Sequence, residues 1–359
     1  MRIGVILSLV ELCKGAGSAG NPVALGPDSV GTCLPGFSCV VVDVLGRSIL
    51  DRTLDRLTAA THTQPTVIVE RPAVTGLFPC DDISASGSTP AWENAIGRHV
   101  LRGVDHLLLI RLNAYTDLDF KELLQSHIQT QSSLTRVYCP TGALDIAVID
   151  ANSLKDSGST YCKALSEIIF RQRRFLYCGY VNGLLSSRDL RRLAEDGLRG
   201  VCRLNPMGVE VRPGVWYEAG ARVHSSAIIE APAYIGTGSN ISASCTIDRA
   251  SAIEHGCVVE YKSTIRQSCL LQNTHIGIGL NVRHAIVFNN KLVQLDRGVE
   301  VNCDARLIGV TSRSAALGWT LPGSLRHMQF FQNSAASANN KLPASGSIGG
   351  SVTHEPKLA

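Results

Sequence analysis

A strict six-residue period of branched aliphatic side chains runs through the chain between residues 223 and 271. Neither the 3.6-residue period of a helix nor the two-residue alternation of a strand produces this spacing. A β-solenoid does, because each hexad supplies a short strand and a corner, and three hexads complete one coil. We therefore expect parallel β coils that enclose nine side chains: Val223, Ile229, Ile235, Ile241, Ile247, Ile253, Val259, Ile265 and Leu271.

A second pattern of small residues accompanies the first. Four positions after each of the first eight aliphatics stands a compact side chain, which fits where the wall of a solenoid turns: Ala227, Ala233, Ser239, Cys245, Ser251, Cys257, Ser263 and Cys269. Beyond Leu271 the period continues, after a slip of one residue, at Ile276, Val282 and Phe288. In such a stack, Ile247→Asp should unfold the array, whereas Asp248→Ala should be nearly silent.

Before the solenoid, the pattern alternates between short apolar runs and amphipathic stretches. Strands are expected over 3–9, 38–44, 66–69, 106–111, 136–139 and 144–149, and helices over 48–60, 92–102, 119–130, 159–172 and 187–198. This alternation is typical of a mostly parallel sheet with helices on both faces. The expected organisation is an α/β domain over 1–205, a solenoid over 206–310 and a C-terminal segment over 311–359 that ends in a disordered tail.

Composition narrows the function classes. The 359 residues are 45% hydrophobic and 18% charged, as in a globular protein, and a net charge of +4 is too small to indicate a nucleic-acid partner. No apolar stretch reaches 18 residues, so no membrane span is expected. Twelve cysteines occur without a CxxC pair. We interpret them as reduced thiols in a cytoplasmic protein.

Three local segments and the order of the parts resemble a known family. Residues 46–57, residues 116–124 with His127, and Gly179-Tyr180 followed by the helix at 189–200 are similar to segments of sugar-1-phosphate nucleotidyltransferases of the mannose-1-phosphate guanylyltransferase kind. The resemblance implies a Rossmann-like nucleotidyltransferase-type domain followed by a left-handed β-helix built of hexapeptide repeats. It also implies a nucleotide or sugar nucleotide as ligand, and Mg²⁺ as cofactor if the protein is active.

The chain departs from this family where catalysis is concerned. Its first strand does not lead into the family's glycine-rich phosphate loop, and the G-x-G-x-x-G match at 15–20 lacks the flanking strand and helix that the motif requires. The family's metal-binding aspartate falls on Asn113, and its second aspartate falls near Asn182 or Gly183. The segment with the family's Glu-Lys pair is missing. Asn113, Gly179, Tyr180 and Asn182 are therefore substrate-binding candidates by position only, and no catalytic or metal-binding residue is assigned.

Three functions remain open. The first is a pseudoenzyme with an eroded site, a regulatory or partner subunit in sugar-nucleotide or envelope-polysaccharide metabolism that forms a homo-oligomer or a complex with an intact homologue. The second is an active nucleotidyltransferase whose metal is bound by Asp43, Asp81, Asp82 or Asp105. The third is a hexapeptide-repeat acyltransferase that uses a solenoid histidine as general base. Its candidate is His275, which replaces a small residue next to the slip, with His224, His255 and His284 as alternatives.

Overall fold

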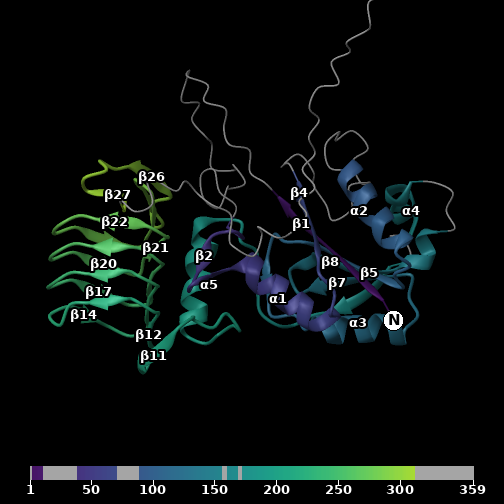
Figure 1. The fold of residues 1–359 in the computed structure, drawn as a ribbon, viewed down its shortest axis with the longest axis horizontal. Coiled ribbons are helices and arrows are strands. Elements are labelled where there is room, and N and C mark those ends of the chain that lie inside the picture. Colours follow the sequence, from purple (N-terminus) through teal and green to yellow (C-terminus); the bar gives the residue numbers. More distant parts are fainter. Residues whose placement is uncertain (1, 11–38, 71–88, 156–159, 169–171, 312–359) are drawn as a thin grey trace, which may run out of the picture.

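The computed structural model describes residues 2–10, 39–70, 89–155, 160–168 and 172–311, and it contains two kinds of architecture. Figure 1 shows a mixed α/β region at one end and a stack of short strands at the other. Helix α5 (Ser187–Leu198), which has the bounds that the sequence predicts, lies between them. None of the helices in these ranges is long and apolar enough to cross a membrane.

The α/β region is built on a six-stranded sheet in the order β4-β1-β5-β8-β7-β9. Only β8 runs antiparallel to its neighbours, so the expected mostly parallel sheet is confirmed. In that order, the strands are Thr66–Glu70, Ile3–Val10, His106–Arg111, Gly142–Asp150, Leu134–Cys139 and Arg173–Leu176.

Helices cover both faces of this sheet. Alternate residues of β1 belong to different hydrophobic clusters: Val5 and Leu7 share one with helices α1 (Ile49–Thr61) and α3 (Phe120–Gln129). Ile6 shares another with α2 (Thr89–Leu101) and α4 (Tyr161–Ile168). A short 3-10 helix, Ala151–Leu154, follows β8. The sequence therefore predicts the positions of these helices, and the described part of α4 begins two residues later than expected.

The prediction of a strand over 38–44 is wrong. Only β2 (Asp43–Val44) is extended, and it pairs with β3 (Arg47–Ser48) in a tight hairpin instead of joining the sheet. Val40 and Val42 are buried, so the apolar run reflects packing and not a strand. Cys39 just before it is disulfide-bonded, which contradicts the prediction that the cysteines are reduced throughout.

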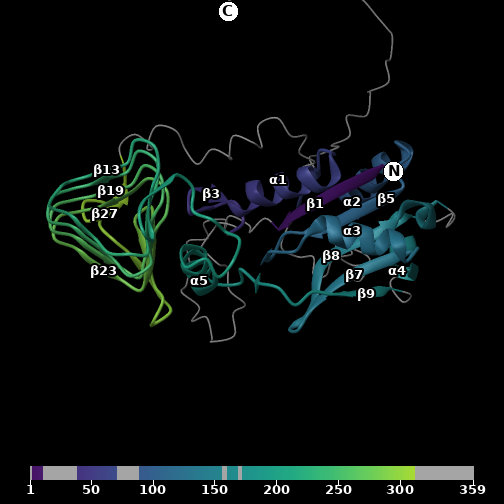
Figure 2. The same cartoon turned by 90° about the horizontal axis from the view of Figure 1, so that it is seen from below.

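The C-terminal region stacks short strands into three sheets, and Figure 2 shows their triangular cross-section. Successive coils pair in parallel at a spacing of 18 residues, as in Ile229↔Ile247↔Ile265. This arrangement is consistent with a parallel β-helix. The first sheet contains β11 (Val209–Arg212), β12 (Val215–Tyr217), β15 (Ala233–Ile235), β18 (Ser251–Ile253), β21 (Cys269–Leu270), β24 (Ala285–Phe288), β25 (Lys291–Gln294) and β26 (Val299–Asn302).

The other two sheets are shorter. One contains β13 (Arg222–Val223), β16 (Asn240–Ile241), β19 (Val258–Val259), β22 (Thr274–Ile276) and β27 (Ile308–Val310). The other contains β14 (Ile228–Ile229), β17 (Thr246–Asp248), β20 (Thr264–Arg266) and β23 (Asn281–Arg283). Strand β27 pairs antiparallel with β22, so it does not continue the parallel order of its sheet.

The predicted core of the stack is confirmed from Val223 to Ile265 and wrong at its last member. The first eight aliphatics pack in one internal cluster. Leu270, not Leu271, pairs with Ile253 and enters that cluster, because the third coil is one residue shorter and the slip precedes residue 270. Leu271 and Cys269 consequently face outward into the cluster shared with the α/β region.

The two regions meet in a continuous hydrophobic interface. Leu190 and Leu193 of α5 belong to the same cluster as Ala252 and Phe288 of the strand stack. Polar contacts reinforce it at the helix end, where the Arg188 Nε atom donates a 2.9 Å hydrogen bond to the carbonyl oxygen of Leu295. The described parts of the two regions are therefore packed together directly.

Candidate functional site

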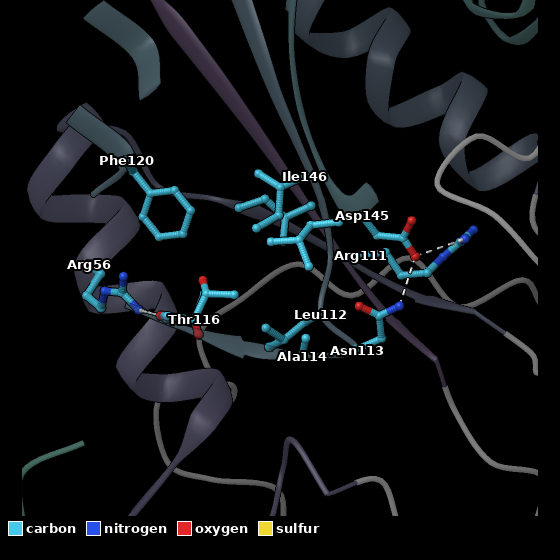
Figure 3. Close-up of a pocket in the computed structure, with 12 residues that line it drawn as sticks. Arg56, Arg111, Leu112, Asn113, Ala114, Thr116, Phe120, Asp145 and Ile146 are labelled. Carbon is cyan, nitrogen blue, oxygen red and sulfur yellow. Dashed lines mark hydrogen bonds and ion pairs between the residues drawn. The ribbon is translucent and has the colours of Figure 1, made fainter. Parts of the chain in front are cut away.

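A shallow pocket opens at the carboxyl end of β5, the edge of an α/β sheet where ligands usually bind. It measures about 370 Å³ with its open mouth included. Figure 3 shows that Arg56 and Phe120 line one side, and that Asn113, Asp145 and Arg111 gather on the other. The pocket thus combines apolar walls with a small cluster of charged groups.

Asp145 is the centre of this charged cluster. Its Oδ2 atom accepts a 2.9 Å hydrogen bond from the Nδ2 atom of Asn113. The same oxygen lies 3.9 Å from Nη1 of Arg111, and Oδ1 lies 3.5 Å from Nη2 of Arg136. Arg111 is only 3% exposed. The Asp145 carboxylate is therefore already surrounded by two guanidinium groups and one amide.

Arg56 on the opposite side has a structural role. Its guanidinium donates to the carbonyl oxygens of Thr116 and Leu118 and lies 5.2 Å from the centroid of the Phe120 ring. These contacts fix helix α1 to the chain that leaves β6 (Tyr115–Thr116). Arg56 adds positive charge to the pocket, but its described hydrogen bonds go to the backbone.

Among the positional candidates, only Asn113 lines the pocket. Asn182 lies in β10 (Val181–Asn182), which pairs with β6, and its Nδ2 atom donates to the carbonyl oxygen of Asp189 at 2.9 Å. The hydroxyl of Tyr180 donates to Asp196 at 2.7 Å. At Gly179, an added Cβ would collide with the Tyr177 ring. Asn182 and Tyr180 therefore join the chain at β10 to α5, and Gly179 packs against Tyr177.

The aspartates considered as replacement metal ligands do not converge on the pocket. Asp43 pairs with His255 at the strand stack, with 3.0 Å between Oδ2 and Nδ1. Asp105 lies just before β5, at the end away from Asn113, where a hydrogen bond from the backbone amide of Arg2 lowers its pKa. Asp81 and Asp82 lie outside the described residues. No group of three potential metal-binding side chains occurs in the part of the chain that the structure describes.

The histidines of the strand stack are separated from one another. Thr274, not His275, takes the small-residue position, because the slip occurs earlier than the sequence predicts. His275 is partly exposed, and its Nε2 atom is 3.7 Å from the Glu260 carboxylate. His224 contacts Ser226, and His284 lies 3.9 Å from Asp296. His275 therefore does not replace a small residue of its hexad, and its role as a general base stays a prediction.

No protein-family model matches the chain, and a search of curated proteins finds no match.

Sequence reasoning missed Asp145 and Arg111. Both carried a usable signal, because each places a charge within or directly after an apolar run, in Leu107–Arg111 and in Ala143–Asp150. A charged residue in a buried strand needs a partner. Pairing the two across β5 and β8 would have required knowledge of the strand order.

Proposed function

We propose that this protein is a nucleotidyltransferase-like pseudoenzyme that serves as a regulatory or partner subunit in sugar-nucleotide metabolism. In this proposal the α/β region is of the nucleotidyltransferase type, the strand stack is a left-handed β-helix, and the protein acts in the cytoplasm with itself or an intact homologue. The resemblance of the sequence motifs supports the family. The chemistry of the pocket supports the loss of catalysis.

The arrangement around Asp145 is the observation that carries the proposal. Asn113 stands at the position that the resemblance assigns to a metal-binding aspartate, and it donates a hydrogen bond to Asp145. Mg²⁺ needs anionic oxygen ligands to compete with its hydration shell. The Asp145 carboxylate is already paired with Arg111 and Arg136, so recruiting it for a metal would break both ion pairs.

Transfer of a nucleotidyl group depends mainly on positioning and on neutralising the charge of the phosphates. Arg111 and Arg136 supply positive charge that suits an anionic ligand, whereas a metal would be repelled by them. The pocket therefore favours binding of a nucleotide or sugar nucleotide without turnover. Such binding would let a partner subunit sense the product of an active homologue.

The test is a Mg²⁺-dependent assay of pyrophosphate release, with each nucleoside triphosphate combined with hexose 1-phosphates. We expect no release above background, and Asn113→Asp alone should not restore it, because the phosphate loop and the lysine segment are still missing. Turnover by the wild-type protein at about 1 s⁻¹ or faster would refute the proposal, since that is the lower end for ordinary enzymes.

If turnover occurs, two variants identify its site. Asp145→Asn should abolish it if Asp145 has taken over metal binding, while Asp105→Asn is the matched control at the other end of β5. Partner function is tested separately, by measuring the molar mass in solution alone and with an intact homologue. A monomer at micromolar concentration that captures no homologue would contradict the proposed subunit role.

A further inference from the structure

A tight turn of the α/β region contacts the strand stack through hydrogen bonds. Leu45 and Gly46 link β2 to β3, and both have positive φ angles, 55° and 89°. This conformation points their amide N–H groups at the stack, where Leu45 N donates to Oε1 of Glu254 at 2.8 Å and Gly46 N donates to Oε2 at 2.9 Å. Each oxygen of one carboxyl group thus holds one amide of the turn.

The opposite side of the turn is held by an arginine. The Nη2 atom of Arg52 donates to the carbonyl oxygens of Val44 at 3.2 Å and Leu45 at 2.9 Å. The turn is therefore clamped between a cation of the α/β region and a carboxyl group of the stack. Glu254 is 1% exposed, so its carboxyl group has no direct access to water.

Several ionisable groups surround this carboxyl group. Asp43 is an acid, Arg52 and His255 are bases, and the remaining neighbours are the Tyr234 hydroxyl and the thiols of Cys257 and Cys269. A second acid, Glu218, faces Tyr234 and His255. Burial, followed by the negative charge of Asp43, raises the pKa of Glu254 to about 7, and the two amide hydrogen bonds offset only part of this. A hydrogen bond with Asp43 raises the pKa of His255.

We propose that Glu254 and the Leu45–Gly46 turn form a proton-dependent clasp, which holds the hairpin of the α/β region against the strand stack at acidic pH and loosens as the pH rises. In the docked state the neutral Glu254 carboxyl is favoured, whereas an undocked, hydrated carboxyl ionises near its ordinary pKa of 4.5. Docking is therefore strongest below pH 4.5 and weakens up to about pH 7. His255 has the same sign, since its protonated form is favoured in the docked state and is lost as the pH rises above 6.5.

Hydrogen exchange of the hairpin measures this clasp directly. The full-length protein is exchanged between pH 5 and 8, and rates for a peptide containing Leu45 and Gly46 are divided by their intrinsic values. Ionisation of Glu254 alone should reduce the protection of this peptide on the order of 50-fold between pH 5 and 8. Peptides from β17 and β20 should change far less. Constant hairpin protection, or a fall that the stack peptides share in full, would overturn the proposal.

Two variants assign the effect to these groups. Glu254→Gln cannot ionise and keeps an oxygen for one amide, so most of the pH-dependent fall should disappear. Asp43→Asn removes the negative charge that helps to raise the pKa of Glu254, and it should reduce the fall even if the first variant does not fold. The control is Glu260→Gln, an acid on another face of the stack that pairs with His275, and it should retain the full fall. An unchanged fall in Asp43→Asn, or its loss in the control, would refute the clasp.

Discussion

Replacing Ile247 by alanine tests the internal core of the strand stack. The side chain is fully buried and lies between Ile229 and Ile265 of the adjacent coils. The change removes three carbons, which at about 0.8 kcal/mol each gives about 2.4 kcal/mol of lost burial. A closed stack cannot collapse around the gap, so a cavity term adds to this. We expect a loss of about 3–4 kcal/mol in the free energy of unfolding, within the usual range for such changes.

Ile228→Ala is a matched control, because the same side chain stands one position before Ile229 and faces solvent. Ile228 is 57% exposed, and its truncation should cost less than about 0.5 kcal/mol. Urea denaturation followed by circular dichroism measures both variants, provided that the slope with denaturant is unchanged. Hydrogen exchange of β17 and β20 localises the loss. A cost below about 1 kcal/mol for Ile247→Ala, or equal costs for both variants, would refute the assigned core.

Three further predictions concern side chains that the fold brings together. Asp248→Ala should destabilise the stack by about 1–3 kcal/mol in the same denaturation assay, because the buried Asp248 Oδ2 atom lies 2.6 Å from Nε of Arg266. The loss should be smaller than for a fully buried ion pair, because the Arg266 side chain is 35% exposed. Gly46→Ala should expose the hairpin to hydrogen exchange, because its Cβ would meet Tyr234 and Glu218 at a positive φ, whereas Gly142→Ala has a positive φ but open space and should leave the hairpin protected. Burial lowers the pKa of His127 from 6.5 to about 4, so the wild type loses free energy of unfolding as the pH falls from 6.5 to 4. In His127→Gln this acid-induced loss should be smaller by up to about 3 kcal/mol, whereas His224→Gln, at an exposed histidine, should leave the loss unchanged.

The solenoid could be predicted because its repeat is local. Each inward aliphatic is six residues from the next, so the pattern needs no knowledge of distant parts of the chain. The predicted register is wrong where two aliphatics, Leu270 and Leu271, are adjacent and either could complete the hexad. The error carried over to His275, whose apparent small-residue position belongs to Thr274.

Asp248 shows that some long-range pairing was predictable. It precedes Arg266 by 18 residues, the length of one coil, so the two side chains stack directly and form an ion pair. The expectation that Asp248→Ala is silent considers one coil alone, and the ion pair between adjacent coils favours a measurable loss of stability instead. By contrast, the Glu254 contacts join residues more than 200 positions apart, and a Leu-Gly turn is a weak hairpin signal beside Asn-Gly.

His127 and Glu254 give the two regions opposite responses to pH. The Nδ1 atom of His127 lies 2.8 Å from the Thr135 hydroxyl inside the α/β region, so acid destabilises that region by favouring a protonated, unfolded histidine. Glu254 loses its docking advantage as the pH rises. His127 destabilises the protein in acid and Glu254 weakens docking at higher pH, so the two effects occur on opposite sides of the pH range. A pH titration with one probe in the hairpin and one in the α/β region therefore separates loosening of the hairpin from unfolding of the α/β region. Loosening of the hairpin as the pH rises should leave the hydrogen-exchange protection of β5 and α3 unchanged. A general loss of stability would lower the protection of these elements as well.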